Sequence, residues 1–243
     1  MRQLKTLGSI VLMVCASAFT NNAMAQSGNS DQHLSQKEKS IIAIASTTGM
    51  GHLSDLKMQL HEGLDAGLTI NEIKEVMVHL YAYCGFPRSI RGLQTFMEVV
   101  EERKAKGIED ELGPPASPIN DKRSKYERGR DNLEKLTGVP QTGTQKGYAA
   151  FAPVIEVFLK EHLFADIFDR DVLTFAEREL VTISVLSSIG GVEPMLYSHL
   201  TICLNLGLTP GQLNEFVEII KATAGDKAAK NAQTVLNEVL KNK

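Results

Sequence analysis

The segment HEGLDAGLTINEIKEVMVHLYAYCG, residues 61–85, has a counterpart later in the chain in LTICLNLGLTPGQLNEFVEIIKATAG, residues 200–225. Both segments contain Gly-Leu-Thr, at 67–69 and at 207–209, and both end in a glycine at the same distance from it. Similarity over so long a stretch indicates that one structural unit occurs twice.

The similarity extends upstream, where LSQKEKSIIAIAS, starting at Leu34, aligns with LTFAERELVTISV, starting at Leu173. The offset between the copies is 139 residues here and 140 residues from Gly-Leu-Thr onward. One residue is therefore inserted in the second copy, between its first helix and Gly-Leu-Thr. We predict two copies of the unit in tandem.

Each copy is predicted to be helical. Hydroxyl and carboxylate residues stand at the spacing of a capping box, which satisfies free backbone N–H groups at a helix start. Apolar residues then recur every three or four positions, as on a buried helix face, and no segment alternates like a strand. Gly67 and Gly207 suit the left-handed residue that follows a helix. The fold class is therefore all-α, a bundle of two helical units. The capping pairs are Ser35 and Glu38, Thr69 and Glu72, and Thr174 and Glu177; the apolar series are Ile73, Val76, Met77 and Leu80, and Leu213, Phe216, Val217 and Ile220.

Between the copies, the stretch KGIEDELGPPASPINDKRSKYERGR, residues 106–130, is rich in charge and holds three of the chain's eight prolines, which is typical of an exposed connector. Two further helices are predicted at 125–136 and 148–164, and the second has enough apolar residues to pack onto the core. The chain is accordingly divided into a signal peptide at 1–25, an exposed segment at 26–33, a first unit at 34–106, a connector with a short helix at 107–147, and a helix plus second unit at 148–243.

The first 25 residues have the features of a cleaved secretory signal peptide. Arg2 and Lys5 precede the apolar run LGSIVLMVCASAF, and Ala23-Met24-Ala25 is a small-x-small cleavage site. We therefore expect a periplasmic or otherwise secreted protein that has no membrane attachment after cleavage. Loss of Arg2 and Lys5 leaves 24 basic against 29 acidic residues, a net charge of −5. This balance does not favour nucleic acid or an anionic membrane as a partner.

Only Cys84 and Cys203 remain after cleavage, and both lie in apolar helical patterns, where a free cysteine behaves as a small hydrophobic residue. We expect them to be unpaired. His52, Asp55 and His61 lack the close spacing of a metal site. No metal and no cofactor are expected.

The two copies resemble the carboxymuconolactone decarboxylase-like family, which includes the alkylhydroperoxidase D-type proteins. In the first copy, GLDAGLTINEIKEVMVHLYAYCGFPRSIRGL is similar to the family's Ala-Gly-Leu-Thr, its apolar helix with a histidine, and its Tyr-x-Gly-x-Pro. In the second copy, ERELVTISVLSSIGG and SHLTICLNLGLT are similar to its Arg-Glu-Leu helix and its histidine-containing helix. The resemblance implies a helical bundle that forms homo-oligomers, here a trimer of tandem chains, and a small-molecule ligand or substrate.

The peroxidase branch of the family uses a Cys-x-x-Cys pair beside a histidine, because this chemistry takes an attacking thiolate and a second thiol. Seven and four residues before His199, where the resemblance places that pair, the chain has Val192 and Met195. Cys84 aligns with Ala224 and lacks a second cysteine at that spacing. We therefore do not expect alkylhydroperoxidase or peroxiredoxin-type activity.

The decarboxylase branch needs only donors for an enolate and one proton, without a metal or an organic cofactor. The resemblance places this chemistry on Glu179 and His199 of the second copy, whose counterparts in the first copy are Ser40 and Gln59. The first copy keeps the other half of the motif, which the second has largely lost. We therefore predict one composite site, in which the catalytic residues Glu179 and His199 face substrate-binding residues of the first copy: His79, Tyr83, Gly85 and Pro87, whose counterparts are Ile219, Thr223, Gly225 and Lys227.

Structural interpretations of the same residues stay open. His79 and His199 are also compatible with satisfied polar groups in a bundle, Glu179 with a carboxylate that complements a helix dipole, and Tyr83 with a packing residue that keeps one wet end. Two functions are therefore predicted as alternatives. One is a cofactor-free acid/base enzyme that decarboxylates or isomerises a small carboxylated lactone or related acid. The other is a non-catalytic small-molecule-binding or assembly module.

Overall fold

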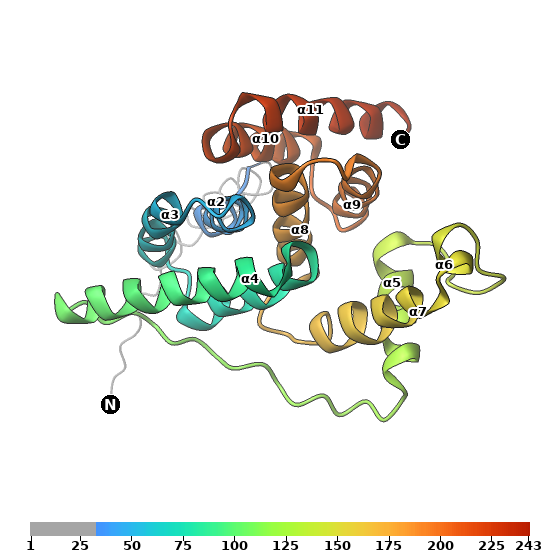
Figure 1. Cartoon of the computed structure of the whole chain (residues 1–243), viewed down its shortest axis with the longest axis horizontal. Helices are drawn as coiled ribbons and strands as arrows, with labels where there is room; N and C mark the ends of the chain where they lie inside the picture. Colours follow the sequence, from blue (N-terminus) through green and yellow to red (C-terminus); the bar gives the residue numbers. More distant parts are fainter. Residues whose placement is uncertain (1–32) are drawn as a thin grey trace, which may run out of the picture.

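The computed structural model describes residues 33–243, which form helices and connecting loops without a β-strand (Figure 1). The predicted all-α fold class is confirmed. The signal peptide and most of the exposed segment, up to residue 32, lie outside the described residues. Within the described residues, none of the helices is long and apolar enough to cross a bilayer. The elements are α2 (Gln36–Met50), α3 (Leu53–Asp65), α4 (Ile70–Ala105), α5 (Lys125–Thr137), α6 (Tyr148–Phe151), α7 (Pro153–Phe158), the π-helix η1 (Leu159–Ile167), α8 (Phe175–Ile189), α9 (Glu193–Asn205), α10 (Pro210–Ala224) and α11 (Asp226–Lys241).

The two copies have the same helical plan. Helices α2, α3 and α4 of the first copy correspond to α8, α9 and the pair α10 and α11 of the second. Gly85 has φ 77° and ψ 162°, so α4 is two helices joined at a break. Gly225, with φ 89° and ψ 172°, separates α10 from α11 in the same way. Both conformations are suited to glycine, which lacks a Cβ. The tandem arrangement and the break at Gly85 are thus confirmed.

Helix starts and turns follow the sequence signals closely. All three predicted capping boxes are present, and two more begin α5 and α10. Gly67 and Gly207 have positive φ, as predicted. The extra residue of the second copy lies in the turn between α8 and α9, where Gly190, Gly191 and Val192 replace the two-residue turn between α2 and α3.

The two units pack through their first helices. Most of α2 and α8 is buried, including the residues at 41–49 and 178–187, as expected of helices that are surrounded by others. Helix α2 lies against α8, while α4 lies against α8 and α10 lies against α2. The third helix of each copy therefore contacts the first helix of the other. This reciprocal packing places side chains of α4 beside those of α8 and α9, as a composite site requires.

The segment predicted as a single packed helix at 148–164 is instead divided into α6, α7 and η1. Ala152 has φ −133° and ψ 75°, because a proline disfavours the helical conformation in the residue before it. Leu163 and Phe164 are buried in a small core with α5, whereas Phe151 is 93% exposed. The prediction that this whole segment packs onto the core is therefore wrong.

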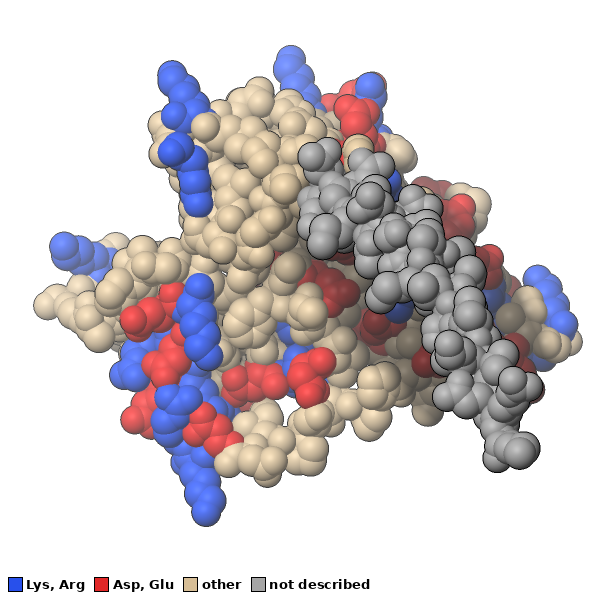
Figure 2. All heavy atoms as spheres, turned by 180° about the vertical axis from the view of Figure 1, so that it is seen from behind, with Lys and Arg blue, Asp and Glu red and all other residues tan. Residues whose placement is uncertain are grey.

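Helices α5 and η1, hereafter the cap helices, pack on each other and cover one side of the second unit. Their shared core includes Leu136 of α5, Phe168 just after η1, and Ile202 of α9. Asn205 of α9 donates hydrogen bonds to two backbone carbonyls at the end of α5. The outer surface is polar: Figure 2 shows acidic and basic side chains intermixed over this end of the molecule, on the left of that view. Lys125, for example, pairs with a carboxylate of η1 at 2.8 Å.

Candidate functional site

Glu179 and His199 form a hydrogen-bonded pair between α8 and α9. The Glu179 side chain is fully buried, and its Oε2 lies 2.7 Å from His199 Nδ1. Because a carboxylate only accepts, Nδ1 carries the proton in this contact, and Nε2 is the free nitrogen of the neutral ring. The histidine side chain is 14% exposed, so the buried carboxylate is connected to the solvent side through the imidazole.

Tyr83 of α4 brings the first copy to this pair. Its ring meets His199 edge-on, with the centroids 5.9 Å apart and the planes at 80°. The Tyr83 hydroxyl and Glu179 Oε1 are both buried without a hydrogen-bond partner among the described residues. Burial raises the pKa of Tyr83 far above its usual value, and the charge of Glu179 adds to the effect. The phenol therefore stays protonated, and buried polar atoms without partners are where a ligand or water is expected.

His79, one turn before Tyr83, is fully buried and has both ring nitrogens in contact with polar groups. Its Nε2 lies 2.9 Å from Thr182 Oγ1, and its Nδ1 lies 3.4 Å from Arg178 Nη1. The Thr182 hydroxyl donates to the Arg178 carbonyl, so it accepts from Nε2–H, while a guanidinium only donates. Burial lowers the pKa of His79 well below its ordinary value, with smaller effects from Arg178 and His199.

The structure thus gives the predicted substrate-binding residue His79 a set of contacts within the protein. Its ring lies between Tyr83 and Phe168, with centroids 5.3 Å and 5.4 Å away. A neutral, hydrogen-bonded imidazole at this place fixes the position of the Tyr83 ring. In this geometry the contacts of His79 are with Thr182, Arg178 and the rings of Tyr83 and Phe168.

Behind His79 lies a buried ion pair that sequence analysis did not single out. Arg178 Nη2 lies 2.8 Å from Glu75 Oε1, and both side chains are at most 2% exposed. Arg170 binds the same carboxylate with Nε and Nη2, at 2.9 to 3.0 Å. Burial lowers the pKa of Arg178, and the hydrogen bond to Glu75 opposes that shift. In the sequence, this ion pair is indicated only by a charged residue within each of two apolar helices, because a buried charge needs a partner.

Gly85 and Pro87, also predicted as substrate-binding, act on the backbone beside Tyr83. Gly85 ends the first half of α4 two residues after Tyr83, and Pro87 lies in the first turn of the second half, with an exposed side chain. The Ser89 hydroxyl donates to the Met77 carbonyl at 2.6 Å and ties the two halves together. Their visible role is to set the direction in which the chain leaves Tyr83.

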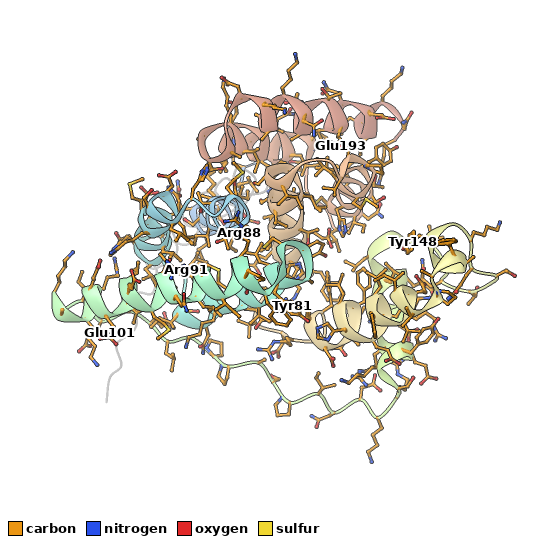
Figure 3. The ribbon with its side chains drawn as sticks, in the orientation of Figure 1. Tyr81, Arg88, Arg91, Glu101, Tyr148 and Glu193 are labelled. Carbon is orange, nitrogen blue, oxygen red and sulfur yellow. The ribbon has the colours of Figure 1, made fainter. Side chains whose placement is uncertain are left out.

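The cap helices close one side of this cluster. The Arg178 guanidinium lies 5.8 Å from the centre of the Phe168 ring. Tyr81 of α4 meets His162 of η1 with ring centroids 5.5 Å apart, and Figure 3 shows Tyr81 where α4 bends, on the side toward η1. Tyr83 packs against the shared core of the cap helices as well, so these helices lie on the side of the cluster that α4 forms.

Both described cysteines are free. Burial raises the pKa of Cys84 to about 11 and that of Cys203 well above its ordinary value. Such thiols are mostly protonated near neutral pH and are weak nucleophiles. His52 and Asp55 form an exposed pair at 3.8 Å. The part of the chain that the structure describes contains no cluster of three or more residues arranged to hold a metal ion.

Comparison with known proteins gives two similarities. A family model described as carboxymuconolactone decarboxylase family matches residues 16–96 and 156–238, one match in each copy and together more than half of the chain. An uncharacterized protein of Methanocaldococcus jannaschii is 28% identical over 74 residues, which cover 30% of this chain and 69% of that protein.

Proposed function

The chain belongs to the carboxymuconolactone decarboxylase family, and from this premise we propose that it is a cofactor-free acid/base enzyme that decarboxylates or isomerises a small carboxylated lactone or related acid. His199 and Glu179 are the acid/base pair of this proposal, and Tyr83 is the hydrogen-bond donor to the substrate. The observation that carries it is the 2.7 Å contact between His199 Nδ1 and Glu179 Oε2 beside two buried polar atoms without partners.

Glu179 sets the state of His199 in the proposed reaction. By accepting from Nδ1–H, the carboxylate fixes the tautomer and leaves Nε2 to exchange the proton. When Nε2 takes up a proton, the buried carboxylate stabilises the imidazolium through the same hydrogen bond. The histidine can therefore serve as base or acid without moving.

Decarboxylation then needs two groups. The bond to the carboxylate carbon breaks, CO2 leaves, and the electron pair moves into the conjugated carbonyl to give an enolate. Tyr83 O–H donates to the enolate oxygen, which stabilises the developing charge, and His199 Nε2–H delivers a proton to carbon. For an isomerisation, His199 removes a proton from one carbon and returns it at another. Neither reaction requires an oxidant or a reductant.

The test is a matched pair of substitutions at equivalent positions of the two copies. With carboxymuconolactone, the compound that the family is named for, His199→Ala should lower kcat/KM by about 10²- to 10⁴-fold, because the acid/base group is lost. Gln59→Ala should leave kcat/KM unchanged. Turnover is followed as CO2 release by the purified protein, and circular dichroism and gel filtration check that each variant keeps its fold and assembly. Full activity of His199→Ala would refute the assignment.

The second candidate function is a non-catalytic small-molecule-binding module. It is favoured by the first copy, where Ser40 and Gln59 stand in place of the acid/base pair, and by the full burial of Glu179 beneath its neighbours. In that case the lactone acid binds, as calorimetry would show, and His199→Ala or Tyr83→Phe weakens the binding, but no product forms with the unmodified protein.

We also propose that the protein assembles into a trimer of tandem chains. Support comes from large apolar side chains that are exposed on α6 and α7, since contiguous exposed apolar surface commonly marks an interaction site. Replacing Phe151 and Phe158 together by serine should yield monomers in light scattering. A monomeric unmodified chain at all concentrations would contradict the proposal. The exposed residues are Tyr148, Phe151, Val154, Ile155 and Phe158.

Export remains a proposal that rests on the composition of the first 25 residues, which lie outside the described part of the chain. In a Gram-negative cell, the protein recovered from the periplasm should begin at Gln26, as N-terminal sequencing would show. A full-length chain retained in the cytoplasm would contradict it.

A further inference from the structure

The exchange of helices between the two copies creates a second place equivalent to the site of Glu179 and His199. It is formed by α2, α3 and α10 in place of α8, α9 and α4. The residues at the four corresponding positions line a single open pocket of about 580 Å³, hereafter the open pocket. They are Ser40 for Glu179, Gln59 for His199, Thr223 for Tyr83 and Ile219 for His79.

The ion pair that joins the first and third helices beside the site of Glu179 and His199 has a counterpart beside the open pocket. Lys39 Nζ lies 3.1 Å from Glu215 Oε2, and these residues align with Arg178 and Glu75. The ion pair between the first and third helices is therefore present in both places. The difference between the sites lies in the groups that face the enclosed space, and these have lost every titratable member of the acid/base cluster.

Two changes account for the open space. The four replacements include three by smaller side chains, and the cap helices cover only the other site. The cap packs on Ile202 and Leu206 of α9, whereas the aligned residues of α3 are Glu62 and Ala66, which line the open pocket. A charged carboxylate and a single methyl group offer much less apolar surface for a cap to pack on than the isoleucine and leucine side chains of α9 do.

Two polar side chains of the open pocket, Ser40 and Gln59, are uncharged. Ser40 and Gln59 are half-buried, and their side chains make no hydrogen bond with the described residues. A hydroxyl and an amide together supply both donors and acceptors. Thr223, in contrast, is engaged with Ser46 and a backbone carbonyl. Ile219 and the neighbouring alanines give the pocket an apolar side.

We propose that the open pocket is a binding site, distinct from the acid/base site, for a small uncharged or cationic molecule that carries an amide or hydroxyl on an apolar body. The volume lies within the range of about 300–1,000 Å³ that is usual for small-molecule sites. The rim carries Glu62 and Glu218, both exposed, while the charge of Lys39 is compensated by Glu215. The local charge is therefore negative, which disfavours the carboxylated compounds expected at the other site.

Benzamide and benzoate are matched probes for this proposal, because they share one shape and differ in charge and in the donor group. In the isotope-labelled protein, benzamide should shift the NMR signals of the backbone amides of Ala43 and Ala222 saturably, with a millimolar Kd typical of so small a ligand. Benzoate should bind at least about tenfold more weakly. Gln59→Leu and Ser40→Ala should each weaken benzamide binding by about three- to tenfold.

His199→Ala is the matched control at the equivalent position and should leave the benzamide Kd unchanged. A change in that variant would place the probe at the acid/base site and overturn the proposal. Shifts that do not saturate, an equal affinity for benzoate, or unaltered binding in Gln59→Leu would overturn it as well. None of these outcomes depends on whether the other site is catalytic.

Discussion

The two sites between the copies occupy equivalent places in the fold and differ in their chemistry. One joins Glu179 to His199 at 2.7 Å beneath the cap helices, whereas the other presents Ser40 and Gln59 in an open pocket. The capping boxes at the helix starts, the glycine breaks and the ion pair between the first and third helices are common to both. The comparison teaches that the features that specify the fold are present in both copies, while the buried pair of a carboxylate and an imidazole is present in only one of the two sites.

The sharpest difference in stability should come from the two aligned ion pairs. Arg178→Met removes the partner of a carboxylate that is 2% exposed and should lower the free energy of unfolding by about 3 kcal/mol or more. Lys39→Met breaks a pair whose side chains are 36% and 25% exposed and should cost about 1 kcal/mol or less. Urea unfolding of both variants measures the difference. Equal losses of unfolding free energy in the two variants would show that the difference in burial between the two ion pairs does not affect their contribution to stability.

Substitutions at the two glycine breaks should, in contrast, lower the free energy of unfolding equally. Gly85→Ala and Gly225→Ala each place a Cβ on a backbone with positive φ, which costs about 1–3 kcal/mol. An added Cβ would lie 3.5 Å from Pro87 at the first site and within 4 Å of nothing at the second. Neither variant therefore has a steric clash to add to the backbone strain. Free energies of unfolding, measured in urea, that differ between the two variants by more than about 1 kcal/mol would contradict the proposed equivalence of the copies.

The smallest expected effect is a pH dependence of the free energy of unfolding. It arises at His79 only, because the aligned residue Ile219 does not titrate. The pKa of His79 lies well below the ordinary value of 6.5, so below pH 6.5 the unfolded chain binds a proton that the folded chain does not. The contribution of His79 to stability is therefore complete above that pH and falls as the pH is lowered, by up to about 1.4 kcal/mol per pH unit.

His79→Gln should remove this part of the pH dependence. Unfolding free energies measured between pH 5 and pH 7 should differ in slope between the variant and the unmodified protein, with the shallower slope in the variant. Ile219→Leu, at the aligned apolar position, serves as the control and should keep the original slope. Identical slopes for all three proteins would mean that His79 takes up its proton in the folded state.

Several elements followed directly from local sequence signals. Capping boxes at Ser35, Thr69 and Thr174 set helix starts, and Gly85 set a break, because these depend on hydrogen bonds and dihedral angles within a few residues. The helix expected at 148–164 failed because the periodicity of its apolar residues was read without the effect of Pro153 on Ala152. The apolar face of α6 and α7 then remained exposed.

The sequence alone determined the all-α class, the tandem duplication and the pairing of Glu179 with His199 as a hypothesis, since repeats and motifs are linear patterns. Only the tertiary structure decided that α4 of one copy lies against α8 of the other, and that Arg178 finds Glu75 across that contact. It also decided that the cap helices cover one of two equivalent sites. Such outcomes depend on which surfaces meet when the helices pack, and residues about 100 positions apart in the chain carry no local signal of that meeting.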